Sequence, residues 1–190
     1  MDSQKGIEGM DTTGRVVWIT GLSAVGKSTV ARHLRDRLVE TGRTVVVVDG
    51  DEVRAIVADD HCGHDRTSRI KNAYRICRMA KMLVDQGLLV IVATMSLYHE
   101  VHAWNREHLP GYLEVFLEAD LDVLRDRDPK ALYRKLASGK ECNLGGVDIE
   151  AEVPAAPHLH IRNNGGPEDI PVVVARIVRE LKLGLEEVRI

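Results

Sequence analysis

Short apolar runs alternate with amphipathic helical patterns along most of the chain. The runs that predict strands cover residues 16–20, 44–48, 88–94, 112–117 and 158–161. The patterns that predict helices cover residues 27–41, 67–86, 100–107, 121–125 and 170–183. Gly42 and Gly87 follow two of these helices, where a left-handed closing residue is favoured. This alternation is typical of an α/β fold, in which helices cover both faces of a parallel sheet.

Two stretches lie outside this alternation. Residues 1–14 contain acids and glycines without an apolar core, so we expect a flexible leader rather than a signal peptide. A single domain over residues 15–190 would follow it. Residues 127–157 are charged and rich in glycine and proline. A long polar segment between two strands predicts a lid, and a mobile surface loop is the alternative.

The composition excludes several classes of protein. The 190 residues are 44% hydrophobic and 29% charged, with a formal net charge of −3, so the basic excess of a protein that binds nucleic acid polymers is missing. The apolar runs are too short to span a bilayer, and the three cysteines form no Cys-x-x-Cys pair. We expect a cytoplasmic protein with reduced thiols that binds neither a membrane nor a nucleic acid polymer.

The most informative motif is a glycine-rich turn between the first predicted strand and the first predicted helix. It reads Gly21, Leu22, Ser23, Ala24, Val25, Gly26, Lys27, Ser28 and Thr29. This is a phosphate-binding loop, in which backbone N–H groups and a helix N-terminus point at phosphate oxygens. Lys27 can reach the β- and γ-phosphates, and the Ser28 hydroxyl can ligate Mg²⁺. The chain is therefore predicted to bind a nucleoside triphosphate.

Acidic residues follow the second predicted strand at Asp49 and Asp51. Ligands of open α/β sheets bind outside the carboxyl ends of the strands, so these acids should face the phosphate loop. One carboxylate there can orient or deprotonate an attacking hydroxyl, and another can hold a magnesium-bound water. An Asp-Gly turn that caps the next helix is the alternative.

A basic stripe follows the predicted helix 67–86, where Arg66, Arg69, Asn72 and Arg75 recur every three residues. Guanidinium groups suit bidentate capture of phosphate or sulfate oxygens. A solvated helix face is the alternative. His99 and His102 also lie three residues apart, at the predicted helix 100–107, and we expect them to form an exposed pair.

Together these clusters resemble the adenylyl-sulfate kinase family, over nearly the whole chain. Beyond the phosphate loop, the matching residues are Asp49-Gly50-Asp51, Val53-Arg54, Arg69, Asn72, Arg75-Ile76, Ala80-Lys81, Arg127-Asp128-Pro129-Lys130, Leu132-Tyr133 and Gly146-Val147-Asp148. The resemblance implies a homodimer with the P-loop kinase fold, a three-layer α/β/α sandwich with a parallel five-stranded sheet and a lid. It implies in-line transfer of the γ-phosphoryl group of ATP, with Mg²⁺, to the ribose 3′-hydroxyl of adenosine 5′-phosphosulfate.

The resemblance also implies roles for single residues. Asp49 would position or deprotonate the acceptor hydroxyl, while Lys27 and Lys130 would neutralise the transferring group. Arg127 would belong to the ATP site. The residues implied to bind the acceptor are Asp51, Arg54, Arg69, Asn72, Arg75 and Ser96, with His64 and Leu144 beside its base.

The chain departs from the family around the acceptor base. The family commonly carries Gly-Phe-Ser and Phe-Thr-Gly-Ile-Asp, whose phenylalanines sandwich the adenine, but here His64 and Leu144 take their places. Base stacking contributes about 1–3 kcal/mol per base. The loop Met95-Ser96-Leu97-Tyr98-His99 also differs from the family's Ile-Ser-Pro-Tyr-Arg.

These departures leave a second acceptor open, a cytidine diphosphate derivative, because a smaller pyrimidine needs less stacking surface. A kinase of sugars or shikimate-like alcohols is a further alternative, since the fold hosts many acceptors. A non-catalytic nucleotide switch is the last alternative. It would leave the arginine stripe unexplained, and the chain has no Asn-Lys-x-Asp string to read guanine.

Overall fold

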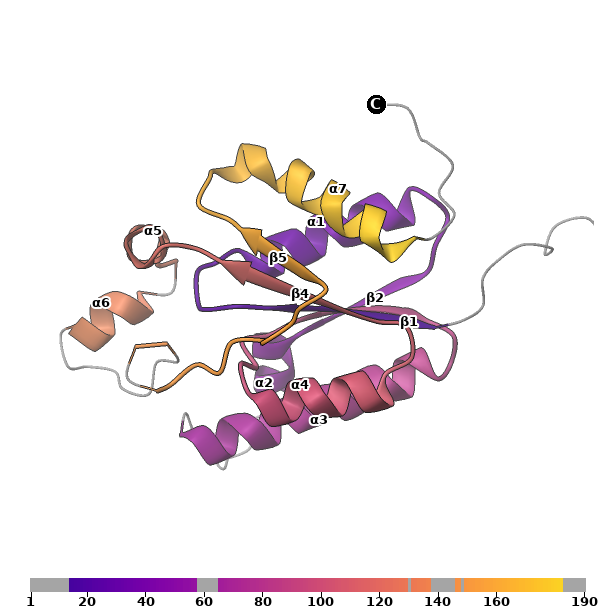
Figure 1. Ribbon diagram of the computed structural model, residues 1–190, viewed down its shortest axis with the longest axis horizontal. Coiled ribbons are helices and arrows are strands. Elements are labelled where there is room, and N and C mark those ends of the chain that lie inside the picture. Colours follow the sequence, from indigo (N-terminus) through magenta and orange to yellow (C-terminus); the bar gives the residue numbers. More distant parts are fainter. Residues whose placement is uncertain (1–13, 58–64, 130, 138–145, 148, 183–190) are drawn as a thin grey trace, which may run out of the picture.

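Five parallel strands form one sheet in the order β2-β3-β1-β4-β5 (Figure 1). The computed structural model describes residues 14–57, 65–129, 131–137, 146–147 and 149–182. The strands are β1 (Arg15–Thr20), β2 (Val45–Asp49), β3 (Leu89–Ala93), β4 (Tyr112–Glu118) and β5 (Leu159–Arg162). Each of the five predicted strands is confirmed, with small shifts at the ends. Central β1 pairs with β3 from Arg15 opposite Leu89 and with β4 from Val16 opposite Tyr112.

Helices cover both faces of this sheet, as the α/β prediction requires. They are α1 (Lys27–Val39), α2 (Gly50–Val57), α3 (Arg66–Val84), α4 (His99–His108), α5 (Leu121–Arg127), α6 (Leu132–Ala137) and α7 (Ile170–Leu181), with a 3₁₀ turn at Pro167–Asp169. Figure 1 shows α1 and α7 on one face and α2, α3 and α4 on the other, which confirms the three-layer sandwich. Within the described part of the chain, no helix is long and apolar enough to cross a membrane.

Alternate residues of the strands build the two halves of the core, because successive side chains of a strand point to opposite faces. On β1, Val17 and Ile19 pack with α1 and α7, whereas Val16 and Trp18 pack with α3 and α4. All four side chains are fully buried. A strand buried on both faces reads as a continuous apolar run, which is why the sequence pattern located β1 correctly.

Two helices, α2 and α6, are absent from the prediction. A short distance before each helix, an aspartate accepts a hydrogen bond from one of the helix's first N–H groups. Asp49 Oδ1 accepts a hydrogen bond from the Asp51 N–H at 2.9 Å, and Asp128 Oδ1 accepts one from the Leu132 N–H at 2.7 Å. Both helices are short, so their stability depends on such contacts and on packing more than on local propensity.

The buried side of α7 should carry much of the stability of the α1 and α7 face. Ile177 is fully buried in the core, whereas Val172 on the same helix is 63% exposed. We expect Ile177→Ala to lower the free energy of unfolding by about 2–5 kcal/mol, because it leaves a cavity. Val172→Ala should change it by less than about 0.5 kcal/mol. Urea denaturation followed by circular dichroism measures both, and equal midpoints would contradict this account of the core.

Candidate active site

The phosphate loop joins β1 to α1 at the carboxyl edge of the sheet. Gly26 has a φ of 99°, a left-handed conformation, and no side chain caps the start of α1. The first N–H groups of α1 are therefore available to an anion. Lys27 Nζ donates a hydrogen bond to the Leu22 carbonyl oxygen at 2.7 Å, so its ammonium group lies over the loop. This arrangement matches the predicted phosphate site.

Asp49, the last residue of β2, lies against this loop. Its Oδ2 accepts a hydrogen bond from the Ser28 hydroxyl at 2.5 Å, while its Oδ1 accepts the Asp51 N–H at 2.9 Å. The carboxylate is therefore held from both sides, by the phosphate loop and by the start of α2. The structure brings together the predicted catalytic carboxylate and the predicted Mg²⁺ ligand, which lie 21 residues apart in the chain.

A cavity of about 990 Å³ follows the carboxyl edge of the sheet and contains Asp49 in its wall. The other predicted site residues that line it are Ser23, Ala24, Gly26, Lys27, Ser28, Thr29, Asp51, Arg54, Arg69, Asn72, Ser96 and Arg127. Residues from the phosphate loop, α2, α3 and the loop after β3 thus share one space. Among the described residues, Gly21, Leu22, Val25 and Arg75 are predicted site residues that do not line it.

Two buried amides in this wall have an oxygen without a hydrogen-bond partner among the described residues. They belong to Asn72 on α3 and to Asn163 after β5, each 4% exposed. Asn163 Nδ2 donates to the Val25 carbonyl oxygen at 2.8 Å, so this side chain supports the phosphate loop from below. A buried polar atom without a partner is costly, which makes both oxygens candidates for contact with a bound ligand.

Sequence reasoning predicted Asn72 but missed Asn163. The signal was present in the run Asn163-Asn164-Gly165-Gly166, which follows the last strand at the edge where the other functional loops lie.

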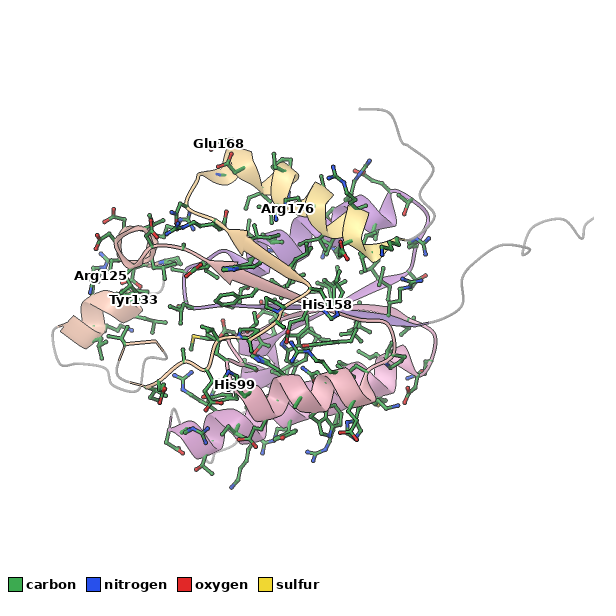
Figure 2. All side chains as sticks on the ribbon, viewed as in Figure 1. His99, Arg125, Tyr133, His158, Glu168 and Arg176 are labelled. Carbon is green, nitrogen blue, oxygen red and sulfur yellow. The ribbon has the colours of Figure 1, made fainter. Side chains whose placement is uncertain are left out.

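The base of the predicted lid is fixed to the phosphate loop. The hydroxyl of Tyr133, a residue of α6 (labelled in Figure 2), donates to the Ser23 carbonyl oxygen at 3.2 Å. Asp128 anchors this helix: burial raises the pKa of its carboxyl, but the N–H groups of Arg134, Tyr133 and Leu132 outweigh burial and bring the pKa below its usual value. The Arg127 guanidinium donates to the Gly165 carbonyl oxygen and so joins the end of α5 to the segment after β5.

A second clamp, also missed by sequence reasoning, joins the segment before β5 to the start of α3 and α4. Glu152 accepts hydrogen bonds from the His99 N–H at 2.8 Å and from the Arg66 guanidinium at 2.5 Å, and these two donors lower the pKa of its carboxyl. Its own N–H donates to the Leu97 carbonyl oxygen at 3.1 Å. Arg66 therefore acts within the scaffold, while Arg69 on the next turn faces the cavity.

Three predicted site residues, His64, Lys130 and Leu144, lie outside the described residues, as do residues 1–13 of the predicted leader. Their roles stay predictions.

The described geometry agrees with comparisons to known proteins. The family model described as "Adenylylsulphate kinase" matches residues 13–162. An adenylyl-sulfate kinase of Aeromonas hydrophila is 37% identical over 188 residues, which cover 97% of this chain and 91% of that protein. A cytidine diphosphoramidate kinase of Campylobacter jejuni is 36% identical over 168 residues, which cover 88% of this chain and 96% of that protein.

The fold comparison gives the same family. The structure of a Mycobacterium tuberculosis APS kinase, solved in complex with AMPPNP and APS, superimposes with a TM-score of 0.82 at 31% identity and covers 90% of this chain and 98% of that one. The agreement thus extends from sequence to architecture. The structure contains the phosphate loop, the Ser28–Asp49 contact and a cavity lined by arginines. The chain belongs to the adenylylsulphate kinase family of ATP-dependent phosphotransferases.

Proposed function

We propose that the chain transfers the γ-phosphoryl group of ATP to the ribose 3′-hydroxyl of adenosine 5′-phosphosulfate. The placement of Asp49 carries this proposal. Its carboxylate accepts a hydrogen bond from Ser28 of the phosphate loop, and Asp49 lines the same cavity as Arg54 and Arg69. A phosphotransferase needs such a group where the triphosphate meets the hydroxyl that attacks it.

The nucleotide end of the cavity fits the triphosphate of ATP and a magnesium ion. The start of α1 offers N–H donors, and Lys27 can exchange the Leu22 carbonyl oxygen for phosphate oxygens. Ser28 Oγ, which is hydrogen-bonded to the Asp49 carboxylate, supplies a hard oxygen ligand of the type that Mg²⁺ prefers. When bound, Mg²⁺ would neutralise negative charge on the β- and γ-phosphates.

The acceptor end is built to hold an anion attached to a nucleoside. Arg54 from α2 and Arg69 from α3 reach the cavity from two elements, so their guanidinium groups can grip a phosphosulfate from two sides. Asn72 Oδ1, which has no hydrogen-bond partner in the described part of the chain, suits a hydroxyl or amino donor of the acceptor. Ser96 completes this wall from the loop after β3.

Asp49 acts mainly by orienting the acceptor, because a hydroxyl is a far weaker acid than a carboxylic acid. Its carboxylate accepts a hydrogen bond from the hydroxyl and directs the oxygen at the γ-phosphorus. It takes up the proton as the new P–O bond forms and the bond from the γ-phosphorus to the β,γ-bridging oxygen breaks, which releases ADP. Lys27 stabilises the charge on the transferring group. The α6 helix, held at Ser23 by Tyr133, limits access of water, which would otherwise hydrolyse ATP.

A second acceptor, a cytidine diphosphate derivative, is favoured by a specific observation. His64 and Leu144 stand where the family carries its two stacking phenylalanines. One of the relatives at similar identity is named a cytidine diphosphoramidate kinase. A pyrimidine needs less stacking surface than adenine, so the phosphate machinery can serve it unchanged.

Consumption of ATP with product identification distinguishes the two acceptors. Adenosine 5′-phosphosulfate and cytidine diphosphoramidate are offered separately, beside gluconate and shikimate as non-nucleotide alcohols. We expect a 3′-phosphorylated product from adenosine 5′-phosphosulfate. Turnover of the cytidine compound alone would establish the second candidate, and turnover of gluconate or shikimate alone would contradict both.

Replacing Asp49 by Asn tests the proposed role of its carboxylate. The amide keeps the size of the side chain but removes the proton acceptor, so kcat should fall by about 10²–10⁴-fold. The Kd for ATP should stay within about threefold, because phosphate-loop contacts remain. Asp36→Asn, at an exposed site on α1, is the matched control and should leave both constants unchanged. A kcat for Asp49→Asn within about twofold of the parent would move the catalytic role elsewhere.

Replacing Gly26 by Ala tests the backbone of the phosphate loop. A Cβ at Gly26 would lie 2.9 Å from Asn163 Nδ2, and its φ of 99° disfavours any other residue. We expect the Kd for ATP, measured by calorimetry, to rise at least about tenfold. Gly42→Ala is the control, since Gly42 also has a positive φ but its Cβ would meet nothing within 4 Å. This control should lose about 1 kcal/mol of stability and keep its ATP affinity. Equal ATP affinities in the two variants would contradict the assignment.

A further inference from the structure

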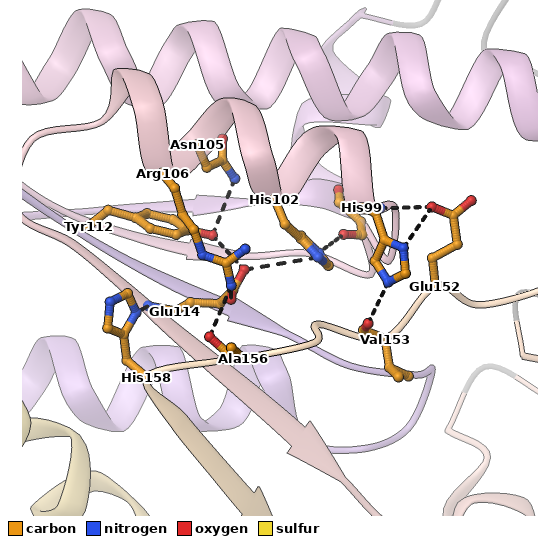
Figure 3. Close-up of polar contacts among 11 residues, drawn as sticks. His99, His102, Asn105, Arg106, Tyr112, Glu114, Glu152, Val153, Ala156 and His158 are labelled. Carbon is orange, nitrogen blue, oxygen red and sulfur yellow. Dashed lines mark hydrogen bonds and ion pairs between the residues drawn. The ribbon is translucent and has the colours of Figure 1, made fainter.

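A cluster of buried polar side chains lies behind the loop that carries Ser96, on the face of the sheet covered by α3 and α4 (Figure 3). Glu114 of β4 and Asn105 of α4 are fully buried, and His102 of α4 is 1% exposed. The surrounding core on this face is apolar, with Val16 and Trp18 on the neighbouring strand β1. Burial of polar groups in such a layer costs free energy unless they are hydrogen-bonded, so each contact in the cluster needs a physical explanation.

Among the described residues, the His102 ring makes one hydrogen bond, and its partner lies in the loop after β3. Its Nε2 lies 2.8 Å from the Ser96 carbonyl oxygen. A carbonyl oxygen only accepts, so the proton is on Nε2 and the ring donates. The other nitrogen, Nδ1, has no hydrogen-bond partner among the described residues and lies 4.0 Å from Glu114 Oε1. Burial lowers the pKa of His102, in agreement with a neutral ring that carries its proton on Nε2. The sequence-based expectation of an exposed histidine pair is therefore wrong for His102.

Glu114 fixes the helix that carries His102. Its carboxylate accepts hydrogen bonds from the Tyr112 hydroxyl at 3.0 Å and from the Arg106 guanidinium. Arg106 also donates to the Ala156 carbonyl oxygen at 3.1 Å, in the segment before β5. Burial raises the pKa of Glu114, and Arg106 and Tyr112 oppose that rise. The helix α4 is thus tied to β4 beneath it and to the segment beside it, which leaves His102 little freedom to move.

Two contacts hold Ser96 in place: the His102 ring donates to its carbonyl oxygen, and the Thr94 hydroxyl lies beside its hydroxyl. Its hydroxyl lies 3.0 Å from Thr94 Oγ1, and both residues line the cavity of the active site. Ser96 is 6% exposed, so its backbone carbonyl would be buried without a partner if His102 lost its donor. The cheapest response is a shift of the loop toward water, which would displace the Ser96 side chain in the cavity.

We propose that His102 is a positioning residue for the acceptor, through the hydrogen bond from its Nε2 to the Ser96 carbonyl. The proposal rests on the proposed function, because it takes the Ser96 end of the cavity as the acceptor site. His102 touches neither ATP nor the reacting atoms. It acts by setting where Ser96 and the loop after β3 meet the acceptor.

A matched pair of substitutions tests this role. In His102→Gln the side-chain amide nitrogen can reach the place of Nε2, whereas in His102→Asn it reaches only the place of Nδ1. We expect His102→Asn to raise the KM of the acceptor at least about tenfold and His102→Gln to stay within about threefold of the parent. The KM of ATP should change less than about twofold in both. His108→Asn, on the same helix and stacked on Trp104, is the control and should leave both KM values unchanged.

Two outcomes of this comparison would overturn the proposal. One is an acceptor KM for His102→Asn equal to that of the parent. The other is an equal rise for His102→Gln and His102→Asn, which would indicate general damage to the core rather than loss of a specific donor.

Amide hydrogen exchange of residues 95–98 provides a readout that needs no acceptor. Exchange should be faster in His102→Asn than in the parent and should recover in His102→Gln, and equal exchange in the three proteins would refute the proposal. This result stands even if no nucleotide-activated acceptor is turned over, in which case the proposed function fails by itself.

If His102→Asn does not fold, ¹⁵N NMR of the parent histidine rings tests the proposal instead. A neutral His102 ring protonated on Nε2 at neutral pH is expected. A ring protonated on Nδ1 would refute the proposal, since it has no donor for Ser96.

Discussion

The parallel direction of the five strands is the constraint on which the rest of the molecule depends. Because all strands run the same way, the segments that follow them emerge at one edge of the sheet. The phosphate loop follows β1, Asp49 ends β2, Ser96 follows β3, the base of the lid follows β4 and Asn163 follows β5. Each strand thus delivers one part of the site, and the central position of β1 places the phosphate loop among the others. No long-range rearrangement of the chain is needed to assemble the cavity.

The two faces of the sheet differ in the kind of side chain that they bury. The face covered by α1 and α7 is packed with aliphatic side chains. The face covered by α3 and α4 contains Asn72, His102, Asn105 and Glu114, all buried. Polar groups give less stability than aliphatic packing, and their directional bonds fix distances instead. We conclude that the α1 and α7 face contributes most of the aliphatic packing, while the α3 and α4 face gives up part of its apolar packing to hold the proposed acceptor wall in place.

Sequence patterns predicted what depends on local periodicity. All five strands and five helices follow from apolar repeats, and the site residues at strand ends follow from the parallel topology that those repeats imply. The α2 and α6 helices were not predicted because they are only eight and six residues long, which is too short for a clear amphipathic repeat. His102 looked like a surface residue because the groups that enclose it, Glu114 among them, belong to other elements. Lid closure, the homodimer and the roles of His64, Lys130 and Leu144 stay predictions.

The two ends of the cavity are built in different ways, and this bears on how the acceptor is chosen. The phosphate end is set largely by backbone, through the left-handed Gly26 and the uncapped start of α1. The acceptor end is set by side chains from α2, α3 and the loop after β3, so it can change without disturbing phosphoryl transfer. In this chain the altered loop is closely packed, with Leu97 3% exposed and Tyr98 5% exposed, and His102 and Glu152 fasten it. A loop without a function would not be expected to keep such specific contacts. Within the described residues, the loop after β3 therefore forms a different but well-packed part of the proposed acceptor wall, and the hydrogen bonds from His102 and Glu152 define its shape.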